Sequence, residues 1–418
     1  MRFHWFPPLA CLLFTAPLSA DEDPLYRIEP TVATQGFDGK QCWVHARAGI
    51  IPAGRPGNPG PDPLAVMTLQ KLELSGSDVF HPLHTMRSAD LGKTWTAPVE
   101  APVFSREPFS WGGRDDLEIT VCDFWPKWHA ASGKLLGTGH TVVYENNAVA
   151  KVGPRSTPYS VYDPASGQWT PWKTLALPGD PKFENAGAGC VQRFDLEDGT
   201  VLLPIYYKTP DALAYSVTVL RCAFDGDELR YLGHGSEMTV PVKRGLCEPS
   251  LIRHQGRFFL TMRNDDHGYI SASDDGQRFS EPVKWCFDDG EDLGSYNTQQ
   301  HWVGHSDGPF LVYTRRGANN DHVMRHRAPL FIARVDPATL RVVRASEQVL
   351  VPEHGARLGN FGVTEVSADE TWVTVTEWMQ APGPNYHDPT PLVARGADNR
   401  VWVSKLKWNK PNLEFPAP

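Results

Sequence analysis

The chain has 418 residues, of which 41% are hydrophobic and 21% are charged. This length and composition are typical of a folded protein with a large core. The formal net charge is −9 and the chain has no run of basic residues, which argues against nucleic acid and anionic membrane surfaces as partners.

Residues 1–20 combine an early arginine, an apolar stretch and a small residue at Ala20. The stretch is too short and too often interrupted by proline for a membrane span, so it predicts a secretory signal peptide. We therefore expect one mature domain over residues 21–418, secreted or periplasmic. Removal of the signal leaves an even number of cysteines, which permits disulfides in an exported protein: Cys42, Cys122, Cys190, Cys222, Cys247 and Cys286. Their wide spacing has no zinc signature, and we expect neither a metal nor a cofactor.

Short apolar runs bounded by Gly, Pro, Asp or Asn predict β-strands throughout the mature region, and helical periodicity is scarce. The clearest strands are, in chain order, Leu64–Leu72, Lys134–Tyr144, Thr200–Tyr207, Arg257–Met262, Pro309–Tyr313, Leu330–Val335 and Glu370–Glu377. Similar turn-and-strand segments recur at intervals of roughly 50 to 65 residues, so the mature chain holds about six units, each the size of a four-stranded blade. The sequence thus predicts an all-β fold, a single six-bladed β-propeller.

Two octets support a repeated β unit. Residues 88–95 read Ser-Ala-Asp-Leu-Gly-Lys-Thr-Trp, and residues 272–279 read Ala-Ser-Asp-Asp-Gly-Gln-Arg-Phe. In the first, a Ser/Asp pair can bond the backbone of a tight turn, Gly92 permits an unusual backbone angle, and Trp95 can pack beneath the turn. The second keeps Asp274, Gly276 and an aromatic Phe279 at the same spacing. We expect both octets to be scaffold, with their aromatic rings buried away from the active site.

The spacing Ser-x-Asp-x-Gly-x-Thr-Trp resembles the Asp-box of the sialidase (neuraminidase) superfamily, and the resemblance covers most of the mature chain. Family members carry further residues in a fixed order around the boxes. The matching positions here are Arg47 before Ile50-Ile51-Pro52, Asp78 before the first box, Glu248 after Cys247, Arg263 at the end of the next strand, and Arg327 in a later unit, with Arg315 and Arg316 as rivals for that last position.

The resemblance implies a role for each matched residue. Three guanidinium groups can hold a substrate carboxylate in fixed geometry, which would be the task of Arg47, Arg263 and Arg327. Asp78 would act as the general acid and base, and Glu248 as the partner of a tyrosine nucleophile. Tyr296 and Gln299, in the segment 294–299, complete the expected substrate-binding set.

The family's tyrosine lies in the last blade, and here Phe361 occupies the expected place. A phenylalanine has no hydroxyl group and cannot be a nucleophile. Tyr296 and Tyr386 are the nearest substitutes, but neither matches the family position. An inverting mechanism with Glu248 and a water molecule is the alternative within the same class.

A second group of residues predicts a different chemistry. His140 and Tyr144 alternate onto one face of a predicted strand, and with an arginine they could carry out β-elimination on a uronate. Two further hypotheses therefore stand beside the main one. The chain is expected to be an exo-acting glycoside hydrolase on an acidic glycan (sialic acid, uronic acid or sulfated sugar); the alternatives are a polysaccharide lyase and a non-catalytic glycan-binding propeller.

Overall fold

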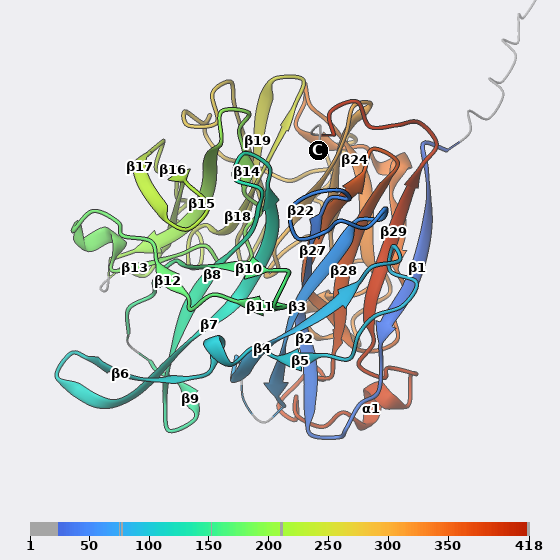
Figure 1. The fold of residues 1–418 in the computed structure, drawn as a ribbon. Coiled ribbons are helices and arrows are strands. Elements are labelled where there is room, and N and C mark those ends of the chain that lie inside the picture. The colour runs from blue at the N-terminus through green and yellow to red at the C-terminus, as the bar shows by residue number, and fades with distance from the viewer. Residues whose placement is uncertain (1–23, 75, 77, 152, 210–211, 416–418) are drawn as a thin grey trace, which may run out of the picture.

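The computed structural model describes residues 24–74, 76, 78–151, 153–209 and 212–415. The predicted signal peptide, residues 1–20, lies outside the described residues. The fold is all-β, and its strands form six sheets (Figure 1). Each of the seven strands predicted from sequence lies within an observed strand. Within the described residues, helix is confined to α1 (Thr390–Val393) and to short 3-10 turns at Pro102–Phe104, Pro181–Phe183, Met324–His326 and Arg344–Ser346.

The first three sheets follow one another along the chain. The first consists of β2 (Gln41–Ile51), β3 (Leu64–Glu73), β4 (Phe80–Ser88) and β5 (Val99–Glu100). The second consists of β6 (Glu107–Trp111), β7 (Arg114–His129), β8 (Lys134–Glu145), β9 (Ala148–Val149), β10 (Pro158–Asp163), β11 (Gln168–Trp169) and β12 (Lys173–Thr174). The third consists of β13 (Asn185–Gly187), β14 (Phe194–Asp195), β15 (Thr200–Lys208), β16 (Ser216–Phe224) and β17 (Leu229–His234).

The remaining sheets complete the chain. The fourth consists of β18 (Cys247–His254), β19 (Arg257–Arg263), β20 (Tyr269–Ser273) and β21 (Val283–Lys284). The fifth consists of β22 (His301–His305), β23 (Gly308–Tyr313), β24 (Leu330–Asp336), β25 (Arg341–Val342) and β26 (Gln348–Val351). The last joins both ends of the chain, because β27 (Arg357–Ser367), β28 (Glu370–Trp378) and β29 (Val401–Trp408) pair with β1 (Tyr26–Thr34).

The sheets are arranged as a β-propeller. Each packs on the next along the chain, through the pairs β2/β7, β8/β13, β15/β18, β18/β22 and β22/β27, and β27 returns to β2. Pairing of β1 with β29 along its whole length ties the N-terminal strand into the last sheet. The edges of the innermost strands are therefore covered by neighbouring sheets, which is how propellers limit exposed strand edges.

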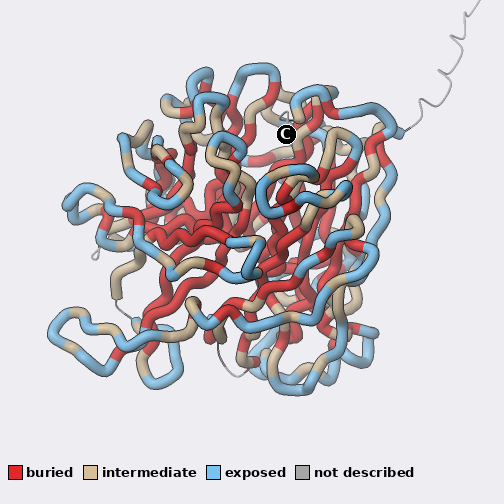
Figure 2. Tube along the Cα trace, in the orientation of Figure 1, coloured by how far each residue is buried: buried red, intermediate tan, exposed pale blue. Residues whose placement is uncertain are grey.

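The apolar core lies between neighbouring sheets. One cluster joins the third and fourth sheets through Val217 and Leu260, and another joins the fifth and last through Val303 and Val373. Figure 2 shows buried backbone concentrated in the centre of the ring and exposed backbone in the outer turns. Successive side chains of a strand point to opposite faces of its sheet. Apolar side chains on both faces therefore pack against the two neighbouring sheets.

The first octet forms the expected turn after β4. Ser88 Oγ accepts a hydrogen bond from the Gly92 N–H at 2.8 Å, and Asp90 accepts bonds from the N–H groups of Lys93 and Thr94. Gly92 has φ +71°, as the turn requires. Trp95 is half-buried rather than fully buried, and its ring lies 6.0 Å from that of Trp372 in the last sheet.

The second octet requires a correction. Ser273 and Asp275 form the turn, not Ala272 and Asp274: Ser273 Oγ accepts from the Gly276 N–H at 2.9 Å, and Asp275 accepts from Gln277 and Arg278. Ser273 and Gly276 are three positions apart, whereas Ser88 and Gly92 are four positions apart, so the second turn is one residue shorter than the first. In both turns the serine stands two positions before the aspartate. Phe279 is half-buried, like Trp95.

The innermost strands share a backbone feature that positions the site. Bulges interrupt the pairing of β2, β7, β18 and β27 on the side of the ring's centre. In each sheet one residue at this level adopts a left-handed conformation, with φ between 45° and 59°: His45, Asp123, Cys190, Glu248, Asn297 and Asn360. Bulges often re-aim side chains at active sites. Four of these residues lie at the bulges, and Cys190 and Asn297 lie in the loops before β14 and β22.

The six described cysteines all carry free thiols, and five of them are buried. Among the described residues, no helix is long and apolar enough to span a membrane.

Candidate active site

Four of the six sheets contribute side chains to a buried network around Asp123, here called the Asp123 network: His45, Arg47, Asp123, His140, Cys190 and Asn360. Left-handed backbone is a rare conformation for a residue other than glycine, and its cost is tolerated mainly at functional sites. Asn, Asp and His adopt it more readily than other side chains, whereas Cys190 and Glu248 have no such preference. The strained positions therefore point to function at the centre of the ring.

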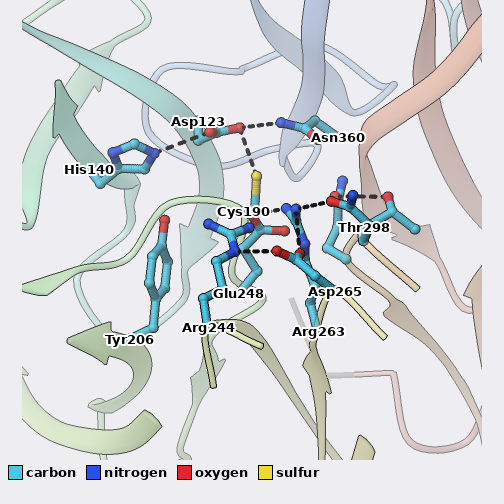
Figure 3. A network of polar contacts seen from close by, with 12 residues as sticks. Asp123, His140, Cys190, Tyr206, Arg244, Glu248, Arg263, Asp265, Thr298 and Asn360 are labelled. Carbon is cyan, nitrogen blue, oxygen red and sulfur yellow. Dashed lines mark hydrogen bonds and ion pairs between the residues drawn. The ribbon is translucent and has the colours of Figure 1, made fainter. Parts of the chain in front are cut away.

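The Asp123 carboxylate is saturated with donors (Figure 3). Oδ1 accepts hydrogen bonds from Arg47 at 3.1 Å, from the Cys190 thiol at 2.7 Å and from Asn360 Nδ2 at 3.0 Å. Oδ2 lies 3.2 Å from His140 Nε2. A buried carboxylate with this many donors is fully compensated.

The charges of this network are fixed by burial and by one another. Burial opposes ionisation of Asp123, but His45, His140 and Arg47 outweigh it and hold the pKa of Asp123 well below its ordinary value. Burial lowers the pKa of His45 to about 4, so that ring is neutral at pH 7. Burial also raises the pKa of the Cys190 thiol well above its ordinary value, which keeps the thiol a hydrogen-bond donor rather than a nucleophile.

Glu248 and Arg263 form the other side of the site. Arg263 donates from NH1 to Glu248 Oε1 at 2.6 Å and from NH2 to Asn297 Oδ1 at 2.6 Å. Asp265 accepts from both Arg263 and Arg244. Burial alone would raise the pKa of Asp265, but these two guanidinium groups hold it below its ordinary value.

The second carboxylate oxygen of Glu248 has no hydrogen-bond partner among the described residues, although the atom is buried. The side chain as a whole is 11% exposed. Burying an unsatisfied carboxylate oxygen is costly. Such an atom on a strained bulge is the arrangement expected of a group that is reserved for a substrate or for a proton.

Three more arginines lie beside Glu248 and Arg263, and with Arg244 they make what we call the arginine cluster: Arg244, Arg263, Arg325, Arg327 and Arg357. Arg327 donates to the backbone carbonyl of Asn297, through Nε at 3.1 Å and also through NH2. Arg357 lies over the Trp378 ring at 4.3 Å and donates to Gln380 Oε1 at 2.5 Å. Arg325 makes no hydrogen bond or ion pair to the described residues and has φ +59°.

The guanidinium groups of the cluster repel one another. Burial, followed by the charges of Arg263, Arg325 and Arg357, lowers the pKa of Arg327 well below its ordinary value. Burial and the charge of Arg325 lower the pKa of Arg357 to about 9. Because a guanidinium remains charged in proteins, these shifts express uncompensated positive charge in a dry environment.

The structure separates the three arginines predicted to bind a carboxylate. Arg263, from β19, and Arg327, from the segment before β24, meet at Asn297. Arg47 lies on the other side, fully buried between Asp123 and Cys190. Arg315 forms an ion pair with Glu347 at 2.6 Å, and Arg316 lies over the Tyr296 ring. Arg357, at the start of β27, was not identified from the sequence.

Asp78 is exposed, with φ +60°. Its negative charge acts on Arg325 and Arg357 of the arginine cluster and also on His45 of the Asp123 network, so it lies near both halves of the site. Tyr144 holds the segment 78–80 in place, because its hydroxyl donates to the Asp78 carbonyl and accepts from the Phe80 N–H, both at 2.9 Å.

Tyr296, Gln299 and Phe361 occupy three different environments. Tyr296 is half-buried, and its hydroxyl lies 2.5 Å from His326 Nδ1. Gln299 is fully buried; with its amide oriented to satisfy both ends, it accepts from the N–H groups of Asn360 and Phe361. Phe361 packs in the core against His301, with ring centroids 4.9 Å apart, while its neighbour Asn360 reaches the site.

The aromatic partner of His140 is Tyr206 of β15, and not Tyr144. The two rings have centroids 6.3 Å apart, and Tyr206 accepts a hydrogen bond from Arg155 at 2.8 Å. Figure 3 shows Tyr206 standing between His140 and Glu248. Gly189 makes room for the imidazole, since a Cβ there would lie 1.7 Å from His140 Cδ2.

Cys122, Asp123 and His140 place one potential metal ligand atom each within 4.8 Å of one another. However, Cys122 Sγ lies 3.4 and 3.6 Å from the two ring nitrogens of His140, so it faces the ring and not one lone pair. Arg47 adds a positive charge 3.1 Å from Asp123. These features favour a hydrogen-bond network over a cation site.

Several site residues escaped the sequence analysis: Asp123, Arg155, Cys190, Tyr206, Asn297, Arg357 and Asn360. One signal could have indicated some of them. Asp123 and Asn360 are polar residues of a type that tolerates left-handed backbone, and neither has another polar side chain within two positions in its strand. No comparable signal marks Tyr206 or Arg357, since each sits in an ordinary strand position.

Comparison with known proteins gives a likeness of fold. No protein-family model and no curated protein sequence matches the chain. Among solved structures, a protein of unknown function from Dyadobacter fermentans matches with a TM-score of 0.58 and 14% identity, covering 93% of this chain and 100% of that one.

Two sialidases are also similar in fold. The NanB sialidase of Streptococcus pneumoniae matches with a TM-score of 0.57 and 11% identity, over 94% of this chain and 71% of its own. The Trypanosoma rangeli sialidase, solved with the inhibitor DANA, matches with a TM-score of 0.54 and 13% identity, over 87% of this chain. The match covers 55% of the Trypanosoma rangeli chain. At these identities the likeness establishes a sialidase-like propeller and nothing finer.

Proposed function

We propose that this protein is an exported, six-bladed propeller enzyme that hydrolyses a glycosidic bond next to an acidic sugar. Each of the six sheets counts as one blade in this proposal. The observation that carries it is the buried, unpartnered Oε2 of Glu248 beside a cluster of arginines. An unpartnered carboxylate oxygen can accept a proton during the reaction. The unmatched positive charge beside it favours a substrate that is itself anionic.

In the proposed reaction Arg263 and Arg327 hold the acidic group of the sugar, and Arg357 adds a third guanidinium. Asp78 protonates the leaving glycosidic oxygen. A water molecule attacks the anomeric carbon, and Glu248 Oε2 accepts its proton. The C–O bond to the leaving sugar breaks as the new C–O bond forms, so the products are a free acidic sugar and a shortened glycan. The substrate-binding roles that the sequence predicted for Arg47, Tyr296 and Gln299 remain predictions.

Simple sialosides should be poor substrates. In retaining sialidases a tyrosine is the nucleophile, but the residue in the corresponding place, Phe361, is buried in the core and has no hydroxyl. Strong cleavage of an aryl sialoside would contradict this part of the proposal and would require a different tyrosine.

The test is a screen of the purified protein against sialosides, uronic-acid glycans and sulfated glycans. For the best substrate, Glu248→Gln and Asp78→Asn should each lower kcat by about 10²–10⁴-fold, because each removes a proton-transfer group. Glu347→Gln, which removes a carboxylate outside the site, is the control. The hydrolase proposal fails if a substrate is cleaved and neither variant slows the reaction.

A second candidate is a lyase, favoured by the placement of Tyr206 and Arg155 next to His140. One of these groups would remove the proton α to a uronate carboxylate, the C–O bond to the leaving sugar would break, and a second group would protonate the leaving oxygen. The product then contains a conjugated C=C bond with new ultraviolet absorbance, which hydrolysis does not produce. Tyr206→Phe should abolish that absorbance; binding without any turnover would favour a lectin-like propeller.

A further inference from the structure

The arginine cluster holds more positive charge than a single carboxylate can match. The acidic groups that act most strongly on its five guanidiniums, among the described residues, are Asp78, Glu248 and Asp265. With all of these groups ionised, two positive charges remain. Glu248 and Asp265 are bonded to Arg263, and Asp265 also to Arg244. The excess therefore lies on Arg325, Arg327 and Arg357.

The individual contacts of these three guanidiniums also provide no hydrogen bond to a negatively charged group of the described residues. Arg327 is 2% exposed, and among the described residues its guanidinium bonds only the neutral carbonyl of Asn297. Arg357 is 4% exposed, bonds the neutral amide of Gln380, and has a buried Nε without a partner. Removing a charge from water without an opposite charge is unfavourable by several kcal/mol. Arg325, exposed at the rim, adds a third charge on strained backbone.

We propose that the ligand of this site carries two negative charges, as a sugar acid with a second anionic substituent such as a sulfate ester does. This inference rests on the proposed function for the identity of the site, and it narrows the substrate class. One anionic group would bind between Arg263 and Arg327, which both donate hydrogen bonds to Asn297. The other would bind Arg357 and Arg325, with Asp78 beside them.

The charge requirement can be tested without knowing the sugar. Malonate and its monomethyl ester are nearly equal in size but differ by one charge. Their affinities for the full protein would be measured by calorimetry at constant ionic strength. Since a charge-assisted hydrogen bond contributes about 1.5–3 kcal/mol, we expect malonate to bind about 10- to 100-fold more tightly than the ester. Equal affinities would overturn the inference.

Two variants locate the second charge. Arg325→Gln, at an exposed position, and Arg357→Met, which keeps the contact with Trp378, should each bring the ratio of affinities toward one. Arg315→Gln is the matched control, since Arg315 is neutralised by Glu347 outside the cluster. A malonate preference that survives both variants would place the dianion elsewhere and contradict the proposal.

A glycan pair separates this inference from the proposed function. Uronate glycans with and without a sulfate ester on the terminal sugar would be compared for binding and for cleavage. Cleavage of both with equal kcat/KM would overturn the dianion inference and leave the hydrolase proposal standing. A preference for malonate and the sulfated glycan in binding, without turnover of either, would overturn the hydrolase and leave the dianion site.

Discussion

The Asp123 network and the arginine cluster are neighbouring halves of one site that differ in how their charges are matched. Both are built on left-handed bulge residues at the centre of the ring. In the Asp123 network one carboxylate is bonded by Arg47, Cys190, Asn360 and His140. In the arginine cluster, guanidiniums outnumber carboxylates. Among the described residues, Glu248, Arg263 and Arg357 each have a buried side-chain atom without a partner, whereas in the Asp123 network only Arg47 has one.

The difference indicates which half is scaffold and which half binds. In the Asp123 network the buried negative charge is fully bonded without a ligand, so this half stabilises the centre of the ring. An unsaturated one is destabilising until a ligand of opposite charge enters. Mutations in the two halves should therefore act in opposite directions on stability.

The largest effect should come from Asp123→Asn. This change leaves Arg47 buried without its counter-charge, and breaking a buried pair in this way costs about 3–5 kcal/mol of unfolding free energy. Urea denaturation at pH 7 measures the loss. Asp116→Asn is the control, because that carboxylate pairs with Arg114 at the surface and should contribute less than about 1 kcal/mol. Equal losses in both variants would refute the scaffold role.

His45 should make the same half sensitive to acid. Its pKa in the folded protein is about 4, below its ordinary value, so the unfolded chain takes up the proton first as the pH falls. Stability is then lost between about pH 6.5 and about pH 4, by up to about 3 kcal/mol.

The measurement is urea denaturation at pH 7 and pH 4.5 for the unmodified protein and for His45→Gln. The variant should lose less stability between the two pH values than the unmodified protein. His387→Gln, at an exposed position, is the control. The same pH dependence in all three proteins would mean that His45 is not the titrating group.

Gly189→Ala should disturb the contact between the third sheet and His140. The new Cβ would lie 1.7 Å from His140 Cδ2, so the imidazole must move away from Asp123. Overpacking of this kind costs about 1–3 kcal/mol. Gly233→Ala, where a Cβ meets nothing within 4 Å, should leave the melting temperature nearly unchanged. An equal shift in both proteins would show that His140 has room to adjust.

The smallest effect has the opposite sign. Arg357→Met removes an unmatched buried charge and keeps the packing on Trp378, so it should stabilise the protein by about 1 kcal/mol while weakening the binding of anions. Arg400→Met, which breaks an ion pair with Glu377, should not stabilise it. Thermal unfolding measures both, and a destabilised Arg357→Met would argue that the arginine is structural.

The sequence by itself determined the class of fold and the positions of its clearest strands. Apolar runs bounded by turn residues are a local property, and the seven strands predicted from them lie within observed ones for that reason. The same holds for the first octet, whose Ser88 and Asp90 bond their own turn. Glu248 and Arg263 were recognised from the family resemblance, and the strand pair β18–β19 brings them together over a short separation in sequence.

Only the tertiary structure decided the composition of the site. Asp123, Cys190 and Asn360 come from different sheets, and they meet because the ring closes and because each of them adopts a left-handed conformation, Asp123 and Asn360 at strand bulges and Cys190 in a loop. Whether an arginine faces a carboxylate or another arginine depends on such long-range contacts, so the charge balance of Arg327 and Arg357 could not be deduced from strand periodicity. The prediction for the second turn, where Ser273 and Asp275 replace the expected pair, was wrong for a local reason. Two adjacent aspartates made both registers compatible with the pattern, and hydrogen bonding to the backbone selected one.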